Sequence, residues 1–177
     1  MKVARLLAFS VAVAAVPGCG SIDHPAAEPR CSIPVFDLNA RDGSGAPVEP
    51  LGSSKRLVDE FAKAVAAKTE SVTMGEMTTR AGWTGTWTHA TYVGSMTTVE
   101  KINKNVGTHL EASCIKGFPP EFGDSDRPSY CFTLFFDAGV PVQAVVWTAA
   151  NPDLTISRPS ITPDTELHYA HGEMWAE

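Results

Sequence analysis

The clearest periodic pattern in the chain lies between residues 53 and 68. Apolar side chains recur there at spacings of three and four, and charged residues fill the positions between them. This spacing places the apolar residues on one face of a helix. A serine just before the pattern, Ser53 or Ser54, can cap its first turn, so we predict one amphipathic helix of about four turns. The apolar positions are Leu57, Val58, Phe61, Ala64 and Val65.

Beyond Ser71 the chain is rich in threonine, valine and aromatic residues interrupted by glycine, which is typical of strands. Asp137-Ala138-Gly139-Val140 separates two strongly apolar runs and predicts a hairpin. Residues 132–136 read as buried on both faces, whereas residues 99–106 fit either a short helix or the polar end of a hairpin. The candidate strands are Val72–Thr79, Trp83–Thr88, Ala90–Thr98, Thr108–Ile115, Tyr130–Asp137, Pro141–Thr148, Leu154–Ser157 and Glu166–Tyr169.

This order of elements favours an α+β fold in which the one amphipathic helix packs on an antiparallel β-meander. The layout resembles that of cystatin-like and nuclear-transport-factor-like folds. The resemblance concerns layout only, because no motif accompanies it, and it implies nothing about activity.

The first eighteen residues have the pattern of an export signal. Lys2 and Arg5 form a basic start, residues 6–16 are apolar apart from Ser10, and Pro17-Gly18 ends the run. The run is well short of the roughly 20 residues that a membrane-spanning helix needs, so a cleaved signal peptide over residues 1–18 is the better interpretation.

Val16, Pro17, Gly18 and Cys19 stand in the register of the lipobox, and the start of the chain resembles that of bacterial lipoproteins. The resemblance covers about twenty residues. It implies cleavage between Gly18 and Cys19 and a diacylglycerol on the Cys19 thiol. Each buried methylene would contribute about 0.8 kcal/mol to membrane binding. We therefore expect a lipid-anchored chain on the extracytoplasmic face of the cell membrane or in an outer envelope layer, with an ordinary secreted protein as the alternative.

Residues 19–50 have the composition of a tether. Five prolines and Asp42-Gly43-Ser44-Gly45 interrupt any long element, although Ser32–Leu38 is apolar enough to dock as an edge strand. We expect a signal at 1–18, a tether at 19–50 and a single α+β domain at 51–177, with Cys31 as the alternative start of that domain.

The mature part is acidic, with twelve basic and twenty acidic residues, and no run of lysines or arginines occurs. Binding to phosphates of DNA or RNA depends on clustered cations, so nucleic acid is an unsuitable partner. The acidity suits solubility at a surface or attraction to a basic protein.

Three cysteines remain once Cys19 is assigned to the lipid. In an oxidising compartment two of them should pair. Cys114 and Cys131 flank one loop between candidate strands, so they are the preferred disulfide, worth about 3 kcal/mol in the chain-entropy model. A bond from Cys31 to either of them is the alternative.

Trp83 and Trp87 share a face if their segment is a strand, with Gly85 leaving a gap between the indoles. This is the shape of a platform for a sugar ring or an apolar ligand, and membership of the core is the alternative.

His168, His171 and Glu173 have donor types that suit zinc or copper. Residues three apart on an extended segment point to opposite faces, so we predict no metal site and no cofactor.

No short catalytic motif is present, and the sequence is interpreted as that of a non-catalytic binding module. Two hypotheses follow. In the first, the domain holds a glycan or lipid of the envelope between helix and sheet, with Trp83 and Trp87 lining the cavity. In the second, it is an inhibitor, immunity or phage-exclusion lipoprotein whose acidic surface meets a basic protein. A cavity would favour the first and a solid core the second.

Overall fold

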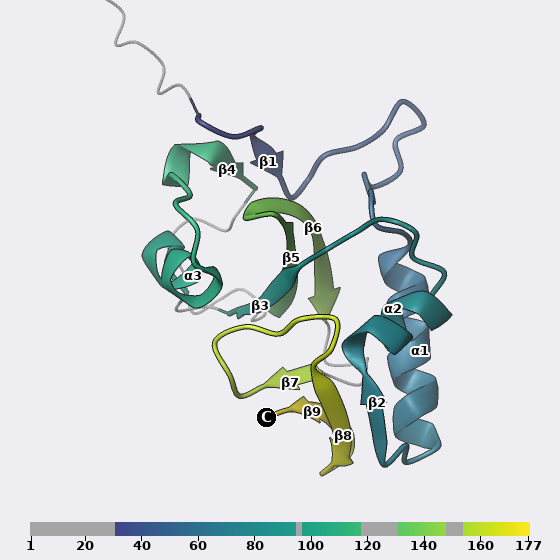
Figure 1. Cartoon of the computed structure of the whole chain (residues 1–177). Coiled ribbons are helices and arrows are strands. Elements are labelled where there is room, and N and C mark those ends of the chain that lie inside the picture. The colour runs from purple at the N-terminus through teal and green to yellow at the C-terminus, as the bar shows by residue number, and fades with distance from the viewer. Residues whose placement is uncertain (1–30, 95–96, 118–130, 148–153) are drawn as a thin grey trace, which may run out of the picture. The chain divides into compact units, whose positions relative to one another are not determined.

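A computed structural model describes residues 31–94, 97–117, 131–147 and 154–177 (Figure 1). The predicted signal at 1–18 and the lipidation site Cys19 lie outside these residues. The described helices are α1 Ser54–Ala66, α2 Met74–Arg80, α3 Val99–Val106 and a short 3₁₀ turn, Ala112–Cys114. The strands are β1 Phe36–Asp37, β2 Ser71–Thr73, β3 His89–Val93, β4 Ile115–Lys116, β5 Cys131–Asp137, β6 Val140–Trp147, β7 Leu154–Ile156, β8 Glu166–Ala170 and β9 Glu173–Ala176.

The strands form three sheets. β3, β5 and β6 make an antiparallel sheet with β5 in its centre. A four-stranded sheet has the order β2-β8-β9-β7, in which β7 and β9 are parallel, and β1 pairs with β4 in parallel. The fold is thus mixed α and β. The described residues contain three α-helices and two parallel strand pairs, so the predicted layout of one helix on a single antiparallel meander is not confirmed, nor is either of the two named layouts.

The β5–β6 hairpin agrees with its prediction. Asp137 pairs with Val140, and the two residues between them, Ala138 and Gly139, have φ of 47° and 82°. Positive φ at both positions is the conformation of a type I′ turn, whose twist matches that of the flanking strands. Every residue of β5 from Phe132 to Phe136 is buried, so both faces of this central strand are covered as predicted.

Two groups of buried side chains lie on opposite faces of β5. Phe135 belongs to the larger group, with Phe61 of α1 and residues of the four-stranded sheet. Phe132, Leu134 and Phe136 belong to the smaller group, with Ile102 of α3 and Ile115 of β4. Strand alternation produces this division, since successive side chains point to opposite faces.

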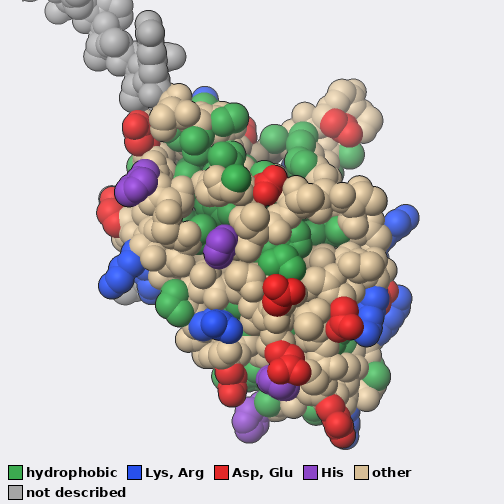
Figure 2. All heavy atoms as spheres, in the orientation of Figure 1, with side chains coloured by type: hydrophobic (Ala, Val, Ile, Leu, Met, Phe, Trp, Pro, Cys, Tyr) green, Lys and Arg blue, Asp and Glu red, His purple; other side chains and the backbone are tan. Residues whose placement is uncertain are grey.

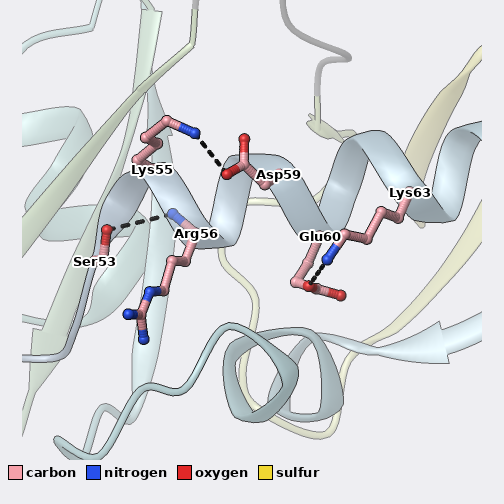
Figure 3. Close-up of polar contacts among 6 residues, drawn as sticks. All are labelled: Ser53, Lys55, Arg56, Asp59, Glu60 and Lys63. Atoms are coloured by element: carbon pink, nitrogen blue, oxygen red, sulfur yellow. Dashed lines mark hydrogen bonds and ion pairs between the residues drawn. The ribbon is translucent and has the colours of Figure 1, made fainter.

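Helix α1 begins where predicted, because the Ser53 hydroxyl accepts a hydrogen bond from the Arg56 amide at 3.3 Å. Its buried face contacts β6 and β9, and the Phe61 ring meets Trp147 edge to face at 5.3 Å. The outer face carries ion pairs within the helix (Figure 3). The apolar residues of the predicted pattern thus face the core, and the charged residues face outward.

The segment Val72–Thr79, predicted as a strand, is a strand only to Thr73 and then forms α2. The Thr73 hydroxyl accepts from the Glu76 amide, and the Glu76 carboxylate accepts from the Thr73 amide, which is a capping box. These two hydrogen bonds start a helix at a position where the residue types alone favoured a strand. No strand occurs over residues 83–88, and Thr108–Ile115 contains only the 3₁₀ turn and the first residue of β4.

One compact unit of the chain spans Cys31–Glu177, and its first residue is the alternative start given above beside the main expectation, Leu51. Within the predicted edge strand only Phe36–Asp37 is extended, and it pairs with β4. Ile33, Phe36 and Leu38 are partly buried against the smaller core group. These apolar contacts explain why the proline-rich stretch from residue 31 packs on the fold instead of serving as a spacer.

Candidate functional site

The two tryptophans predicted as a ligand platform are part of the core. Trp83 and Trp87 are only 8% and 7% exposed. Both rings meet the Phe135 ring edge to face, at 5.0 and 5.1 Å between centroids. The Trp83 indole nitrogen also donates to the Ser53 carbonyl at 3.1 Å. Neither indole offers a free face to a sugar, so the alternative of a core role describes them.

Gly85 leaves space for the backbone and not for a ligand. A Cβ at this position would stand 2.8 Å from the Pro50 carbonyl oxygen and 2.9 Å from the Leu51 Cα. The Gly85 amide donates to the Leu51 carbonyl at 3.2 Å. The loop holding the tryptophans is therefore pressed directly onto the chain that leads into α1.

Gln143 fixes the same chain from the side of the sheet. It lies on β6, is 2% exposed, and its side-chain oxygen accepts from the Leu51 amide at 2.9 Å. Its side-chain nitrogen donates to the Gly52 carbonyl at 2.8 Å and to the Ser54 hydroxyl at 3.1 Å. A buried amide with these three partners holds the start of α1 against the sheet. The space between helix and sheet is occupied by these groups.

Two hollows stand out among the described residues, and both are open to solvent. The larger, of about 280 Å³, lies between α1 and α2 and is lined mainly by charged side chains. The smaller, of about 200 Å³, is lined by Tyr92, Cys131, Trp147 and the strand β7. Pockets for drug-sized ligands are usually about 300–1,000 Å³. Neither hollow is the cavity between helix and sheet that a bound glycan or lipid would require.

The disulfide predicted between Cys114 and Cys131 is wrong. Cys31 is bonded to Cys114, with 5.5 Å between their Cα atoms. The parallel pairing of β1 with β4, which places Phe36 opposite Ile115, brings the two cysteines that precede these strands together. Cys131 is a half-buried free thiol at the start of β5.

The histidines of the C-terminal hairpin do not gather around a metal. His168 on β8 pairs with Trp175, whereas His171 lies in the turn with φ of 52°, and its ring meets Trp175 at 6.0 Å. Within the part of the chain that the structure describes, no group of three His, Cys, Asp or Glu side chains could hold a metal ion.

An exposed loop over residues 40–48 is the most distinctive surface feature, and we call it the β1–α1 loop. It extends away from the helices and sheets (Figure 1) and forms the lobe at the upper right of Figure 2. Its ends are joined by the bridge between Arg41 and Pro47 and by a hydrogen bond from the Val48 amide to the Ala40 carbonyl at 3.2 Å. The loop is thus a narrow hairpin-like projection.

Asp42 orders the tip of this loop. Its carboxylate accepts from the Ser44 amide at 2.8 Å, the Ser44 hydroxyl at 2.6 Å and the Ala46 amide at 3.1 Å. These hydrogen bonds, chiefly the one from the Ser44 hydroxyl, hold the pKa of the Asp42 carboxyl below its usual value. A Cβ added at Gly43 or Gly45 would touch nothing within 4 Å. The tip is therefore fixed from within, and its outer side is open.

This loop lies within residues 19–50, the stretch predicted as a tether. The sequence did contain a signal for an ordered turn, namely Asp42 followed by Gly43-Ser44-Gly45. The side chain of an aspartate commonly accepts a hydrogen bond from the backbone amide two residues later, which forms a turn. Val35 and Val48, each 47% exposed, also lie within residues 19–50, and Val48 is the last residue of the loop.

Comparison with known proteins gives no relative: no family model, no curated protein and no solved structure matches the chain. Among the described helices, none has the length and apolar character needed to cross a membrane.

Proposed function

We propose that this chain is a cell-envelope lipoprotein, anchored through Cys19, whose folded unit binds a protein partner without catalysing a reaction. The observation that carries the proposal is the β1–α1 loop, which is ordered by Asp42 and exposed from Arg41 to Val48. A loop already held in one conformation loses little entropy when it binds, so rigid projecting loops suit protein recognition. The filled space between helix and sheet favours this hypothesis over the cavity for a glycan or lipid.

The distribution of apolar and charged residues supports a protein partner. Val48, at the end of the β1–α1 loop, is 47% exposed and is one of the four large apolar side chains most exposed among the described residues. An exposed apolar side chain on a projecting loop can supply apolar contact area to a protein partner. The excess of acidic residues in the mature chain would speed association with a basic protein.

The lipid anchor is tested with the intact chain in its host. We expect wild-type protein to incorporate labelled palmitate and to sediment with membranes, and the Cys19→Ser variant to lose both properties, because the acyl chains supply the binding energy. A Cys131→Ser variant serves as the control. Equal membrane partition of the Cys19→Ser and wild-type chains would overturn the anchor.

The partner site is tested by placing a photo-crosslinking side chain at Gly43, at the tip of the loop, in the full chain, because added atoms there meet nothing within 4 Å and the hydrogen bonds of Ser44 to Asp42 are kept. The matched control carries the same group at Lys68, which is exposed just beyond the end of α1. We expect one discrete adduct with an envelope protein from position 43 and none from position 68. Equal adduct patterns from the two positions, or no adduct from position 43, would contradict a protein-binding loop.

A further inference from the structure

The larger surface hollow lies between two neighbouring helices of the fold, and we call it the α1–α2 groove. Helix α1 contacts α2 directly, and the groove of about 280 Å³ opens beside this contact. Figure 3 shows Arg56 and the Glu60–Lys63 pair on the same side of α1. The residues that line the groove are Arg56, Asp59, Glu60, Lys63, Arg80, Ala81 and Gly82.

Both carboxylates in the groove already have cationic partners on α1. Asp59 accepts from Lys55 at 2.7 Å, and Glu60 accepts from Lys63 at 2.6 Å. Within the described residues, no carboxylate lies within ion-pair distance of Arg56 or Arg80. Two positively charged guanidinium groups are therefore left without an anionic partner among the described residues.

Both arginines line the groove, Arg56 from α1 and Arg80 from the end of α2. Gly82, with φ of 75°, follows Ala81, the C-cap of α2, and a Cβ at this position would stand 3.6 Å from an Arg56 guanidinium nitrogen. Arg80 is the last residue of α2, two positions earlier. The carbonyl end of a helix has about half a negative charge, which attracts Arg56 but cannot neutralise two full positive charges.

We propose that the α1–α2 groove binds the phosphate group of a small phosphorylated ligand or a phospholipid headgroup, with Arg56 and Arg80 as its donors. Each guanidinium presents a planar fork of N–H groups, and a phosphate has enough oxygens to accept from two forks at once. A hollow of this volume has room for the phosphate and part of an attached organic group. The inference concerns a different surface from the β1–α1 loop and does not depend on the protein partner.

The site is tested by calorimetric titration of the full chain carrying Cys19→Ser, so that no acyl group is attached, with inorganic phosphate as the probe. We expect Arg56→Gln and Arg80→Gln each to weaken binding about tenfold or more, since each removes charge-assisted hydrogen bonds. Arg41→Gln, which removes an exposed arginine on the β1–α1 loop, is the matched control and should bind as the parent does. Arg56→Lys, which keeps the charge but loses the fork, should also weaken binding.

Two arms distinguish the sources of phosphate. Sedimentation with vesicles of phosphatidylglycerol and phosphatidylcholine, lost in the Arg56→Gln and Arg80→Gln variants, would identify a lipid headgroup. Phosphate binding without vesicle binding would identify a soluble ligand. Equal effects of Arg80→Gln and Arg41→Gln, or no saturable phosphate binding by a chain whose melting temperature is unchanged, would overturn the proposal.

Discussion

The bond between Cys31 and Cys114 should supply a large part of the stability of the fold. The two cysteines are 83 positions apart, and Cys114 is fully buried. Closing a loop of this length lowers the entropy of the unfolded chain by an amount worth about 4.5 kcal/mol at 25 °C, and losses on removing native disulfides are about 2–5 kcal/mol. The loss should therefore be a substantial fraction of the about 5–15 kcal/mol that keeps a typical domain folded.

The test replaces Cys31 by alanine in a chain that already carries Cys19→Ser and Cys131→Ser, so that no other cysteine of the chain can bond to Cys114. Urea unfolding, followed by tryptophan fluorescence, compares this triple variant with the chain that carries only Cys19→Ser and Cys131→Ser. We expect a loss of about 2–5 kcal/mol in the free energy of unfolding. A loss below about 1 kcal/mol would refute the reasoning from chain entropy. A non-reducing peptide map that joins Cys114 to Cys131 would refute the connectivity itself.

Three further predictions concern the contacts of the loops. Gln143→Leu should cost about 2–3 kcal/mol of unfolding free energy, because it leaves the buried Leu51 amide without an acceptor; chemical denaturation measures this loss. Gly85→Ala should cost about 1–3 kcal/mol of unfolding free energy, because the added Cβ meets backbone atoms. Gly43→Ala should be neutral or slightly stabilising, because its Cβ meets nothing within 4 Å. Thermal melts of the two variants compare these effects. The pKa of Asp42 is lowered in the folded chain, so its ordering of the loop should persist above the ordinary aspartate pKa of about 3.9 and fade as pH falls below it. NMR order parameters of residues 43–46 should fall under those conditions and, at neutral pH, in Asp42→Asn; unchanged values in both cases would contradict this role.

Local patterns predicted the elements whose signals are complete within a few residues. The apolar spacing after Ser53 predicted α1, and the turn between Asp137 and Val140 predicted the β5–β6 hairpin. Helix α2 was missed because the threonines of Val72–Thr79, together with Val72 and Gly75, are residue types common in strands and turns. Its capping box, Thr73 with Glu76, was nevertheless legible in the sequence and is the stronger physical signal.

Contacts between distant parts of the chain could not be predicted in this way. Cys114 and Cys131 looked like partners because they flank one loop, yet the pairing of β1 with β4 brings Cys31 to Cys114. Likewise, nothing near Trp83 in the sequence shows that Phe135 and the chain entering α1 will enclose it. Sequence spacing describes neighbours along the chain, whereas these contacts depend on which strands lie side by side.

The position of the Cys31–Cys114 bond has a mechanical consequence. Tension applied through the chain ahead of Cys31, as any attachment on that side would transmit, enters the folded unit at a residue that is covalently joined to Cys114. The load then passes through the sulfur bridge and bypasses residues 32–113, which include the described helices α1, α2 and α3 and the β1–α1 loop. Pulling therefore cannot unravel this stretch, its helices included, from that end while the bridge is intact, and reduction would expose the whole stretch to force.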